Sequence, residues 1–444
     1  MELMEKGSMN LSNPSLNQKT LPQVVIVGGG CGGIAAARAL KEVPVQVILF
    51  DKVNHYLFQA LLYQVATSML DAGDIAFPIR EVLRKQKNVI VGMAEVTGVD
   101  KEKRCVYVNP LNRPIPYDYL ILSTGVEGSY FGHDEWAKFA PRLKTLTDGI
   151  LLRSKILRAF EKAELQENPK NHPETVTFVI VGAGPTGCEM AGALADMIRG
   201  TMKSDFRRFD PKTAKIILVD SASRVLPTFS PELSEKVRAQ LEKMGVEVRL
   251  GHVVEQVDAK GVVVAGEQIN SQNVIWAAGM TASPAGKWLG VETDRAGRVK
   301  VNPDLTITGY PEIFVVGDTA LTMSKEGKPL PGVAQVAMQE GTYAGRSVAR
   351  RVAGDPTLPP FKYFDKGNLA TIGWNYAILE SGNLKLAGFL AKVLWAFVHI
   401  FFLLEAQDRI VVFMKWVYGI FTKKRGSRIV EEPILCQPCD QKLQ

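Results

Sequence analysis

The hydrophobic pattern of the chain consists largely of short apolar runs, rich in Val and Ile, that end at glycine or aspartate. Residues 24–40 read VVIVGGGCGGIAAARAL, which is an apolar run, a glycine-rich turn and an Ala-rich segment with high helix propensity. The later runs VQVILFD (45–51) and YDYLILSTG (117–125) have the length and composition of buried strands. Apolar strands that alternate with helices predict an α/β fold built on parallel sheets.

The same pattern occurs a second time along the chain. Residues 177–194 read TFVIVGAGPTGCEMAGAL, and a later run, NVIWAAG, ends at Gly279. The first glycines of the two turns, Gly28 and Gly182, are 154 residues apart, and 97 residues separate each of them from the glycine, Gly125 or Gly279, that closes the later strand. The equal spacing predicts an internal duplication and therefore two Rossmann-like domains.

Both glycine-rich turns have the spacing of a dinucleotide site. Glycine allows the tight turn and the close approach of a pyrophosphate, and the following helix offers free N–H groups to the phosphates. Asp51 ends the next strand, where a carboxylate accepts hydrogen bonds from ribose hydroxyls. The candidate binding residues are Gly28, Gly30, Gly33, Asp51, Thr124 and Gly125 in the first copy, and Gly182, Gly184, Gly187, Ala278 and Gly279 in the second.

The acid of the second copy is Asp220, which ends the run KIILVD and follows Gly182 by 38 residues. The charged insertion MIRGTMKSDFRRFDPKTA explains the long interval. After Asp220 come Ser221, Ala222 and Ser223, and the first Arg is Arg224. A carboxylate accepts a 2′-hydroxyl but repels a 2′-phosphate, so NADH is favoured over NADPH. If Asp220 only caps its strand, the choice of nucleotide stays open.

Residues 306–320, TITGYPEIFVVGDTA, resemble the strand with which two-dinucleotide flavoproteins return to their FAD domain. In that superfamily the Asp after the Gly, here Gly317 and Asp318, bonds the ribityl chain of the flavin. The resemblance implies that the first copy binds FAD noncovalently and that the second is an inserted NADH domain. The expected domains are a disordered N-terminus (1–20), an FAD domain (21–145 and 296–375), an NADH domain (146–295), C-terminal helices (380–430) and a tail (431–444).

Composition agrees with several packed domains. Of the 444 residues, 46% are hydrophobic and 22% are charged, which excludes a disordered or fibrous chain. The first 20 residues have neither the apolar core of a secretory signal nor the pattern of a transit peptide. The five cysteines fit a reducing compartment, and the CQPC of Cys436 and Cys439 lacks a second pair or a nearby His, so no metal site is expected.

The sequence also restricts the electron acceptor. The stretch after Asp51 lacks the cysteine pair of disulfide reductases, and only Cys105 and Cys188 are available for the thiol chemistry of sulfide:quinone reductases. In PGVAQVAMQEG (331–341), Gln335 and Gln339 are four residues apart and share a helix face. Their amides can donate to the carbonyl of a flat ring, although a solvated helix face would show the same pattern.

The glutamine pair, LFQALLYQVAT (57–67) and GPTGCEMAG (184–192) together resemble the type II NADH:quinone oxidoreductases. The resemblance implies that Gln335 and Gln339 line the quinone site, that Glu189 lies near the nicotinamide and quinone and supplies protons, and that electron transfer occurs without proton pumping. Ala60 departs from the Pro of many members, and no calcium-loop insertion is present. Two other interpretations remain: a flavin reductase that uses oxygen or a soluble carrier, and a redox sensor that holds NADH without turnover.

The C-terminal segment combines apolar and basic residues. Residues 388–404 read GFLAKVLWAFVHIFFLL, and the excess of positive charge lies between Lys385 and Arg428. Lys385, Lys392 and His399 are seven apart, which predicts one polar stripe on an amphipathic helix, followed by a second helix that ends at KKRGSR.

Bulky apolar residues around these charges argue against nucleic acid. They favour a helical hairpin on an anionic membrane surface, at the cytoplasmic face. A membrane span and a dimer interface without lipid are the alternatives, and the family resemblance implies a homodimer.

Overall fold

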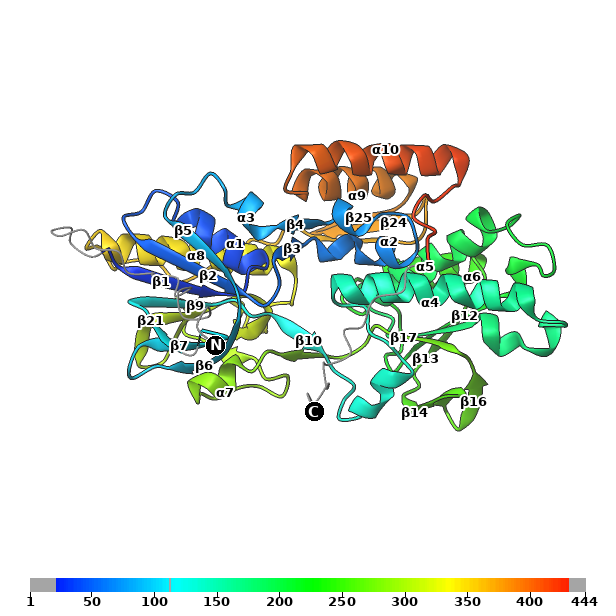
Figure 1. The fold of residues 1–444 in the computed structure, drawn as a ribbon, viewed down its shortest axis with the longest axis horizontal. Helices are drawn as coiled ribbons and strands as arrows, with labels where there is room; N and C mark the ends of the chain where they lie inside the picture. Colours follow the sequence, from blue (N-terminus) through cyan, green and yellow to red (C-terminus); the bar gives the residue numbers. More distant parts are fainter. Residues whose placement is uncertain (1–20, 112, 431–444) are drawn as a thin grey trace, which may run out of the picture.

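The structure, a computed structural model, describes residues 21–111 and 113–430, so the predictions for residues 1–20 and for the tail with Cys436 and Cys439 lie outside the described residues. Figure 1 shows two α/β lobes side by side. The central sheet of the first lobe has the order β20-β21-β9-β1-β2-β5, and only β20 runs antiparallel to its neighbour. Its strands are β1 (Gln23–Val27), β2 (Gln46–Asp51), β5 (Val89–Met93), β9 (Tyr119–Leu122), β20 (Thr306–Ile307) and β21 (Tyr310–Val315).

Alternating side chains of this sheet enter two separate cores, because successive residues of a strand point to opposite faces. Val24 and Ile26 of β1 join the core under the helices α1 (Cys31–Ala39) and α8 (Ala334–Val352). Val25 and Val27 join the core under an antiparallel sheet of β6 (Glu95–Asp100), β7 (Cys105–Asn109) and β8 (Pro114–Pro116). The strands are therefore buried on both faces, as their continuous apolar runs predict.

The second lobe repeats this plan. Its parallel sheet has the order β13-β12-β11-β17 and contains β11 (Thr177–Val181), β12 (Lys215–Asp220), β13 (Val246–Leu250) and β17 (Asn273–Trp276). The helices are α4 (Leu146–Leu165), α5 (Pro185–Asp196) and α6 (Pro231–Lys243), and the small antiparallel sheet is β14 (Val254–Asp258), β15 (Gly261–Val264) and β16 (Glu267–Asn270). The order β2-β1-β9 in one lobe matches β12-β11-β17 in the other, which confirms the predicted duplication.

Short elements connect the lobes and complete the first one. The strands β10 (Val126–Gly128) and β18 (Met280–Ala282) pair antiparallel where the chain passes between the lobes. The helix α7 (Ala285–Leu289) packs against β6, although it falls in the segment 146–295 expected for the second domain. The first lobe is completed by β3 (His55–Leu57), β4 (Ala76–Pro78), α3 (Ile79–Val82), β19 (Val299–Lys300) and β22 (Ala320–Leu321). The short helix α2 (Leu62–Ala66), between β3 and β4, extends from this lobe and packs against α4 and α5 of the second.

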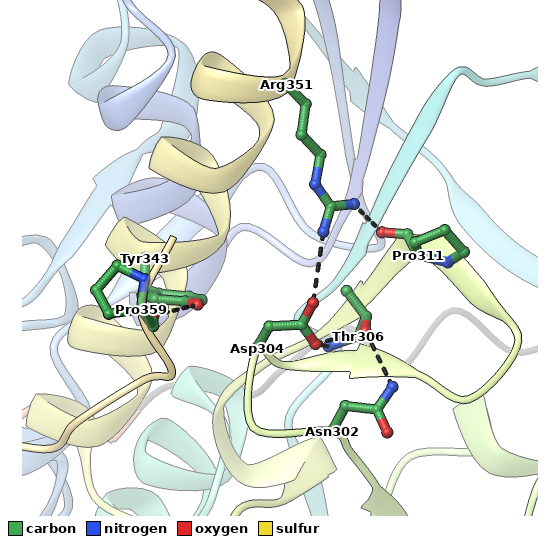
Figure 2. A network of polar contacts seen from close by, with 7 residues as sticks. All are labelled: Asn302, Asp304, Thr306, Pro311, Tyr343, Arg351 and Pro359. Carbon is green, nitrogen blue, oxygen red and sulfur yellow. Dashed lines mark hydrogen bonds and ion pairs between the residues drawn. The ribbon is translucent and has the colours of Figure 1, made fainter. Parts of the chain in front are cut away.

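The helix α8 is held on the first lobe at two points. It crosses α1 so closely that a Cβ placed at Gly341 would lie 2.0 Å from Gly32 O. Near its C-terminus, Arg351 Nη2 lies 3.4 Å from Asp304 Oδ2 and its other terminal nitrogen donates to Pro311 O, as Figure 2 shows. These contacts fix the middle and the C-terminal part of α8 on the lobe, and Gln335 lies in its N-terminal turn.

The C-terminal part forms a small sheet and a helical hairpin. The sheet contains β23 (Asn368–Thr371), β24 (Ala377–Ser381) and β25 (Leu384–Gly388), and the hairpin contains α9 (Phe389–Phe402) and α10 (Ala406–Thr422). In Figure 1 the two helices lie together along the outer edge of the molecule. Lys385 belongs to β25 and pairs with Glu380, so the predicted helical stripe of Lys385, Lys392 and His399 is wrong at its first member.

The hairpin turns its polar side chains toward the protein and its apolar ones outward. Lys392 and His399 face inward on α9, and Trp395 between them is fully buried. The exposed apolar side chains of the two helices are Phe389, Leu390, Val393, Phe397, Phe401, Ile410, Phe413, Met414, Tyr418, Ile420 and Phe421. Within residues 21–111 and 113–430, no helix has both the length and the apolar character that a membrane span requires.

Residues after α10 connect both lobes to the hairpin. The buried guanidinium of Arg425 donates to Thr67 O, just after α2, and, over 2.8 Å, to Ala193 O of α5. On α10 itself, Lys415 Nζ lies 2.6 Å from Asp74 Oδ2 and 2.9 Å from Asp71 Oδ2. Since α2 packs against α4 and α5, these contacts join the hairpin to the second lobe and to the segment of the first lobe that lies on it.

Candidate active site

The first glycine-rich turn has the geometry of a phosphate cradle. Gly28 has φ +101°, and a Cβ there would lie 2.2 Å from Ser123 O, so the position requires glycine. A Cβ at Gly33 would lie 1.8 Å from Gly28 O, whereas Gly30 faces open space with no atom within 4 Å. Asp51 Oδ2 accepts from Gly29 N over 2.6 Å. Gly30 can therefore admit a pyrophosphate, and Asp51 holds the turn.

The second turn reproduces each of these features. Gly182 has φ +109°, a Cβ at Gly187 would lie 1.7 Å from Gly182 O, and Gly184 again faces open space. Asp220 Oδ2 accepts from Ala183 N, and its Oδ1 accepts from Ala222 N over 2.7 Å. Asp220 thus has a structural role in the turn, while its contact with a ribose stays a prediction.

The turns that close the later strands differ between the copies. Gly125 has φ +68° and faces open space. Thr124 Oγ1 lies 3.2 Å from Thr319 Oγ1, which joins this turn to the turn of Asp318. Gly279 has φ +69°, but a Cβ there would lie 2.5 Å from Ser129 O and 2.8 Å from Phe131 Cζ. Ala278, beside it, is partly buried. The ring of Phe131 therefore covers Gly279 in the second copy, at the point where the first copy is open at Gly125.

Asp318 lies in the short turn Gly317–Thr319, which follows β21. This turn lies beside the end of β9, because Thr319 contacts Thr124. Burial raises the pKa of Asp318, and Lys144 opposes that rise. Burial also lowers the pKa of Lys144, whose Nζ donates to Gln59 Oε1 over 3.1 Å. The sequence alone did not identify Lys144, because no glycine or strand motif surrounds it.

The cysteines do not form a redox pair in the part of the chain that the structure describes. Cys31, Cys105 and Cys188 are all free there. Cys31 Sγ lies 3.4 Å from the Tyr56 hydroxyl at the start of α1, and burial raises the pKa of its thiol. Burial also raises the pKa of the Cys188 thiol, and a protonated thiol is a poor nucleophile, so neither Cys31 nor Cys188 has the features of a reactive thiol.

The two predicted glutamines contact one backbone segment. Gln335 Nε2 donates to Gly367 O over 3.0 Å, and Lys366 N donates to Gln335 Oε1 over 3.2 Å. Gln339 makes the corresponding pair of bonds with Phe364, both 2.9 Å. Both amides are thus on one face of α8 and hold the segment that leads into β23. Both glutamines are half-buried, because this segment covers the face of α8 that carries them.

Glu189 is buried in α5 and faces the other end of the same segment. Its Oε1 accepts from Thr371 N over 3.4 Å. Lys392 Nζ donates to Thr371 Oγ1 over 2.7 Å, so the carboxyl and the amine converge on one residue of β23. Burial raises the pKa of Glu189 to about 8 and lowers the pKa of Lys392 to about 7. Burial thus favours the neutral form of each group, a protonated carboxyl and an uncharged amine.

An apolar cavity of about 130 Å³ lies between this cluster and the hairpin. Its polar end includes Lys392, Asp196 and Arg425, and its apolar walls come from α9 and α10. Trp416 Nε1, on one wall, donates to Gln64 Oε1 over 2.8 Å. The sequence did not reveal the cavity, because Lys392 faces inward only through the packing of α9 on β23 and β24.

Comparisons with known proteins agree with this geometry. The model of the family "pyridine nucleotide-disulphide oxidoreductase" matches residues 22–341. The chain is 42% identical to the type II NADH:quinone oxidoreductase Ndh of Mycobacterium tuberculosis, over 92% of this chain and 90% of the relative. It is 30% identical to the type II NADH:quinone oxidoreductase of Staphylococcus aureus, over 79% of this chain and 87% of the relative.

Solved structures are similar in fold. NDH2 from Plasmodium falciparum in complex with NADH matches with a TM-score of 0.84 at 20% identity, covering 93% of this chain and 100% of that one. The sulfide:quinone oxidoreductase of Aquifex aeolicus matches with a TM-score of 0.71 at 17% identity, covering 94% of this chain and 98% of that one.

Proposed function

Because the chain belongs to the pyridine nucleotide-disulphide oxidoreductase family and, within it, to the type II NADH:quinone oxidoreductases, we propose that it transfers electrons from NADH, through noncovalent FAD, to a membrane quinone. The observation that carries the proposal is the pair of equivalent glycine turns in one molecule, each with an open second glycine. Two adjacent dinucleotides are what a hydride transfer from nicotinamide to flavin requires. The reaction needs neither an iron–sulfur centre nor proton pumping.

The first lobe is the proposed FAD site and the second the proposed NADH site. Gly28, Gly30 and Gly33 would admit the pyrophosphate of FAD, and Asp318 would bond its ribityl chain. When bound, the flavin accepts a hydride and passes the electrons on. In the second lobe, Gly182, Gly184 and Gly187 take the pyrophosphate of NADH. The carboxylate of Asp220 favours a 2′-hydroxyl over a 2′-phosphate.

The acceptor side is proposed for the segment between α8 and β23. Gln335 and Gln339 position residues 364–367, and Glu189 and Lys392 converge on Thr371. Reduction of a quinone consumes two protons as well as two electrons. A buried carboxyl with a raised pKa supplies one at neutral pH, and the nearby cavity is apolar enough for a quinone ring.

The hairpin is the proposed membrane contact. Its outward apolar side chains, from Phe389 to Phe421, form an exposed surface rich in Phe and aliphatic residues, the composition that binds lipid, and Lys423 and Lys424 follow directly. Such basic residues are attracted to anionic headgroups, which supports a position at the cytoplasmic face of the membrane. A homodimer is part of the same proposal.

Steady-state NADH oxidation by the purified protein tests the function. We expect a yellow protein with releasable FAD that oxidises NADH rapidly when a short-chain quinone is present. Turnover with oxygen or a soluble carrier but not with quinone would select the flavin-reductase alternative. NADH binding without turnover would select a redox sensor.

A further inference from the structure

Phe131, beside the second glycine-rich turn, has an unfavourable backbone conformation. Its backbone has φ +55°, in the left-handed region that large side chains rarely adopt, and its side chain is 68% exposed. Strain of this kind persists only where the surrounding structure imposes it, and it concentrates at binding sites. The ring nevertheless lies directly on Gly279, the glycine that closes β17.

The residues around Phe131 hold its loop rigidly on the second lobe. Phe131 N donates to Ser129 Oγ over 3.0 Å, and Ser129 O accepts from Trp276 Nε1 over 2.9 Å. The ring of Trp276 packs against Tyr130, with 5.2 Å between centroids, and edge-on against Phe131 at 6.4 Å. The exposed ring is therefore held in place by a buried aromatic cluster and does not hang freely in solvent.

The sheet order shows which part of a dinucleotide would meet this ring. In the order β13-β12-β11-β17, Asp220 ends β12 on one side of the glycine turn and Gly279 follows β17 on the other. The pyrophosphate lies at the turn and the adenosine ribose beside Asp220, so the nicotinamide half extends toward Gly279. In the first copy, the equivalent Gly125 has open space at this point.

We propose that Phe131 is a positioning residue for NADH, whose ring forms a wall against the nicotinamide half of the nucleotide. The inference rests on the proposed assignment of the second turn to NADH and adds a residue to it. An aromatic wall restricts the sideways movement of the nicotinamide and so orients it toward the first lobe. The rigid loop supplies this contact without any rearrangement.

Calorimetric titration of the oxidised holoenzyme tests the proposal with two ligands. NAD⁺ contains the nicotinamide half, and ADP lacks it. Removing an aromatic contact of ordinary strength should raise the Kd for NAD⁺ about three- to tenfold in Phe131→Ala and Phe131→Gly. The Kd for ADP should stay within about twofold of the wild-type value, and Phe131→Trp should retain NAD⁺ affinity.

Phe131→Gly separates binding from stability, because glycine relieves the positive φ. Its melting temperature should match or exceed that of the wild type while NAD⁺ binding weakens. Tyr107→Ala, which removes an exposed aromatic ring from β7 of the first lobe, should change neither Kd. Unchanged NAD⁺ affinity in Phe131→Ala, or equal weakening of NAD⁺ and ADP, would overturn the inference. A wild-type protein that binds neither ligand would overturn the assignment of the second turn itself.

Discussion

The carboxyl group of Glu189 is buried, and this burial raises its pKa to about 8. The group is therefore protonated below that pH and can donate a proton to a reduced quinone, whereas above it the donor is lost. We expect kcat with a short-chain quinone to fall as the pH rises through about 8 in the wild type. Glu189→Gln should lower kcat and lose this descending limb in a profile from about pH 6 to 9.5.

Reduction of the flavin by NADH without quinone is the control for Glu189. Glu189→Gln should leave its rate and pH dependence close to those of the wild type. Equal loss in both half-reactions would assign Glu189 to folding of α5. A variant that keeps the descending limb would move the proton donor elsewhere, with Lys392 as the next group to replace.

Gln335 provides a second prediction. Gln335→Ala removes the bonds to Lys366 N and Gly367 O, and each neutral bond contributes about 0.5–1.5 kcal/mol. The two bonds hold the segment at the proposed acceptor site, and together they contribute about 1–3 kcal/mol, so quinone turnover should fall about 5- to 150-fold, while stopped-flow reduction of FAD by NADH stays near the wild-type rate.

Gln335→Glu is the matched variant, because it keeps the acceptor for Lys366 N and loses the donor to Gly367 O. It should fall between the wild type and Gln335→Ala in quinone turnover. Equal slowing of both half-reactions would assign Gln335 to flavin positioning, and no change in either would remove it from the acceptor side.

Residues differ in how far sequence alone could place them. Gly28 and Gly182 were predictable, because backbone angles and close contacts within a short turn fix their identity. The polar stripe of Lys392 and His399 was predictable, but not that it faces the protein, since the inward direction of Lys392 depends on β23, which lies 21 residues away at Thr371. Phe131 has no local signal, because its strained conformation is imposed by the distant Gly279 and Trp276.

Among the elements, the crossing of α1 and α8 is the tightest contact. A Cβ at Gly341 would lie 2.0 Å from Gly32 O, which is far inside van der Waals contact with rigid backbone. Although alanine favours helices, Gly341→Ala should destabilise the first lobe by about 1–3 kcal/mol. We expect a lower melting temperature and faster release of FAD. Gly200→Ala, at a helical glycine that faces open space, should show neither effect, and equal stability of the two variants would contradict the tight crossing.

The sequence predicted the two C-terminal helices but not the strand before them. Lys385 fits the seven-residue spacing of a helix, yet β25 pairs with β24 and the helix begins only at Phe389. Pairing with a neighbouring strand thus overrides a local periodicity. Many apolar side chains of α9 and α10 point outward, as a hairpin on a membrane surface requires.

At the scale of the whole molecule, the outward face of the hairpin predicts lipid binding. Phe397 and Phe421 are strongly exposed, and burying one Phe side chain contributes about 1.5–3 kcal/mol. Replacing both with Ser should reduce flotation with anionic vesicles about tenfold or more, and rising salt should weaken the binding of the wild type.

Leu165→Ser is the control for this experiment, because Leu165 is equally exposed at the end of α4 in the second lobe. It should float like the wild type. Turnover of short-chain quinone by the double Phe variant should persist in solution. If the double variant floats as well as the wild type, the hairpin face has another role.

The hydrogen bonds of the buried Arg425 side chain oppose movement of the two lobes during turnover. One guanidinium bonds the backbone at Thr67, just after α2, and at Ala193 of α5, and α2 itself packs against α4 and α5. The segment of the first lobe between β3 and β4 is thereby fixed on the second lobe, so a rotation of one lobe against the other would have to pull this segment away. We therefore expect catalysis without hinge motion. Large domain movements are damped by solvent friction, so kcat should stay constant when sucrose raises the viscosity about threefold. A kcat that falls in proportion to viscosity would show that the lobes move in every cycle despite these contacts.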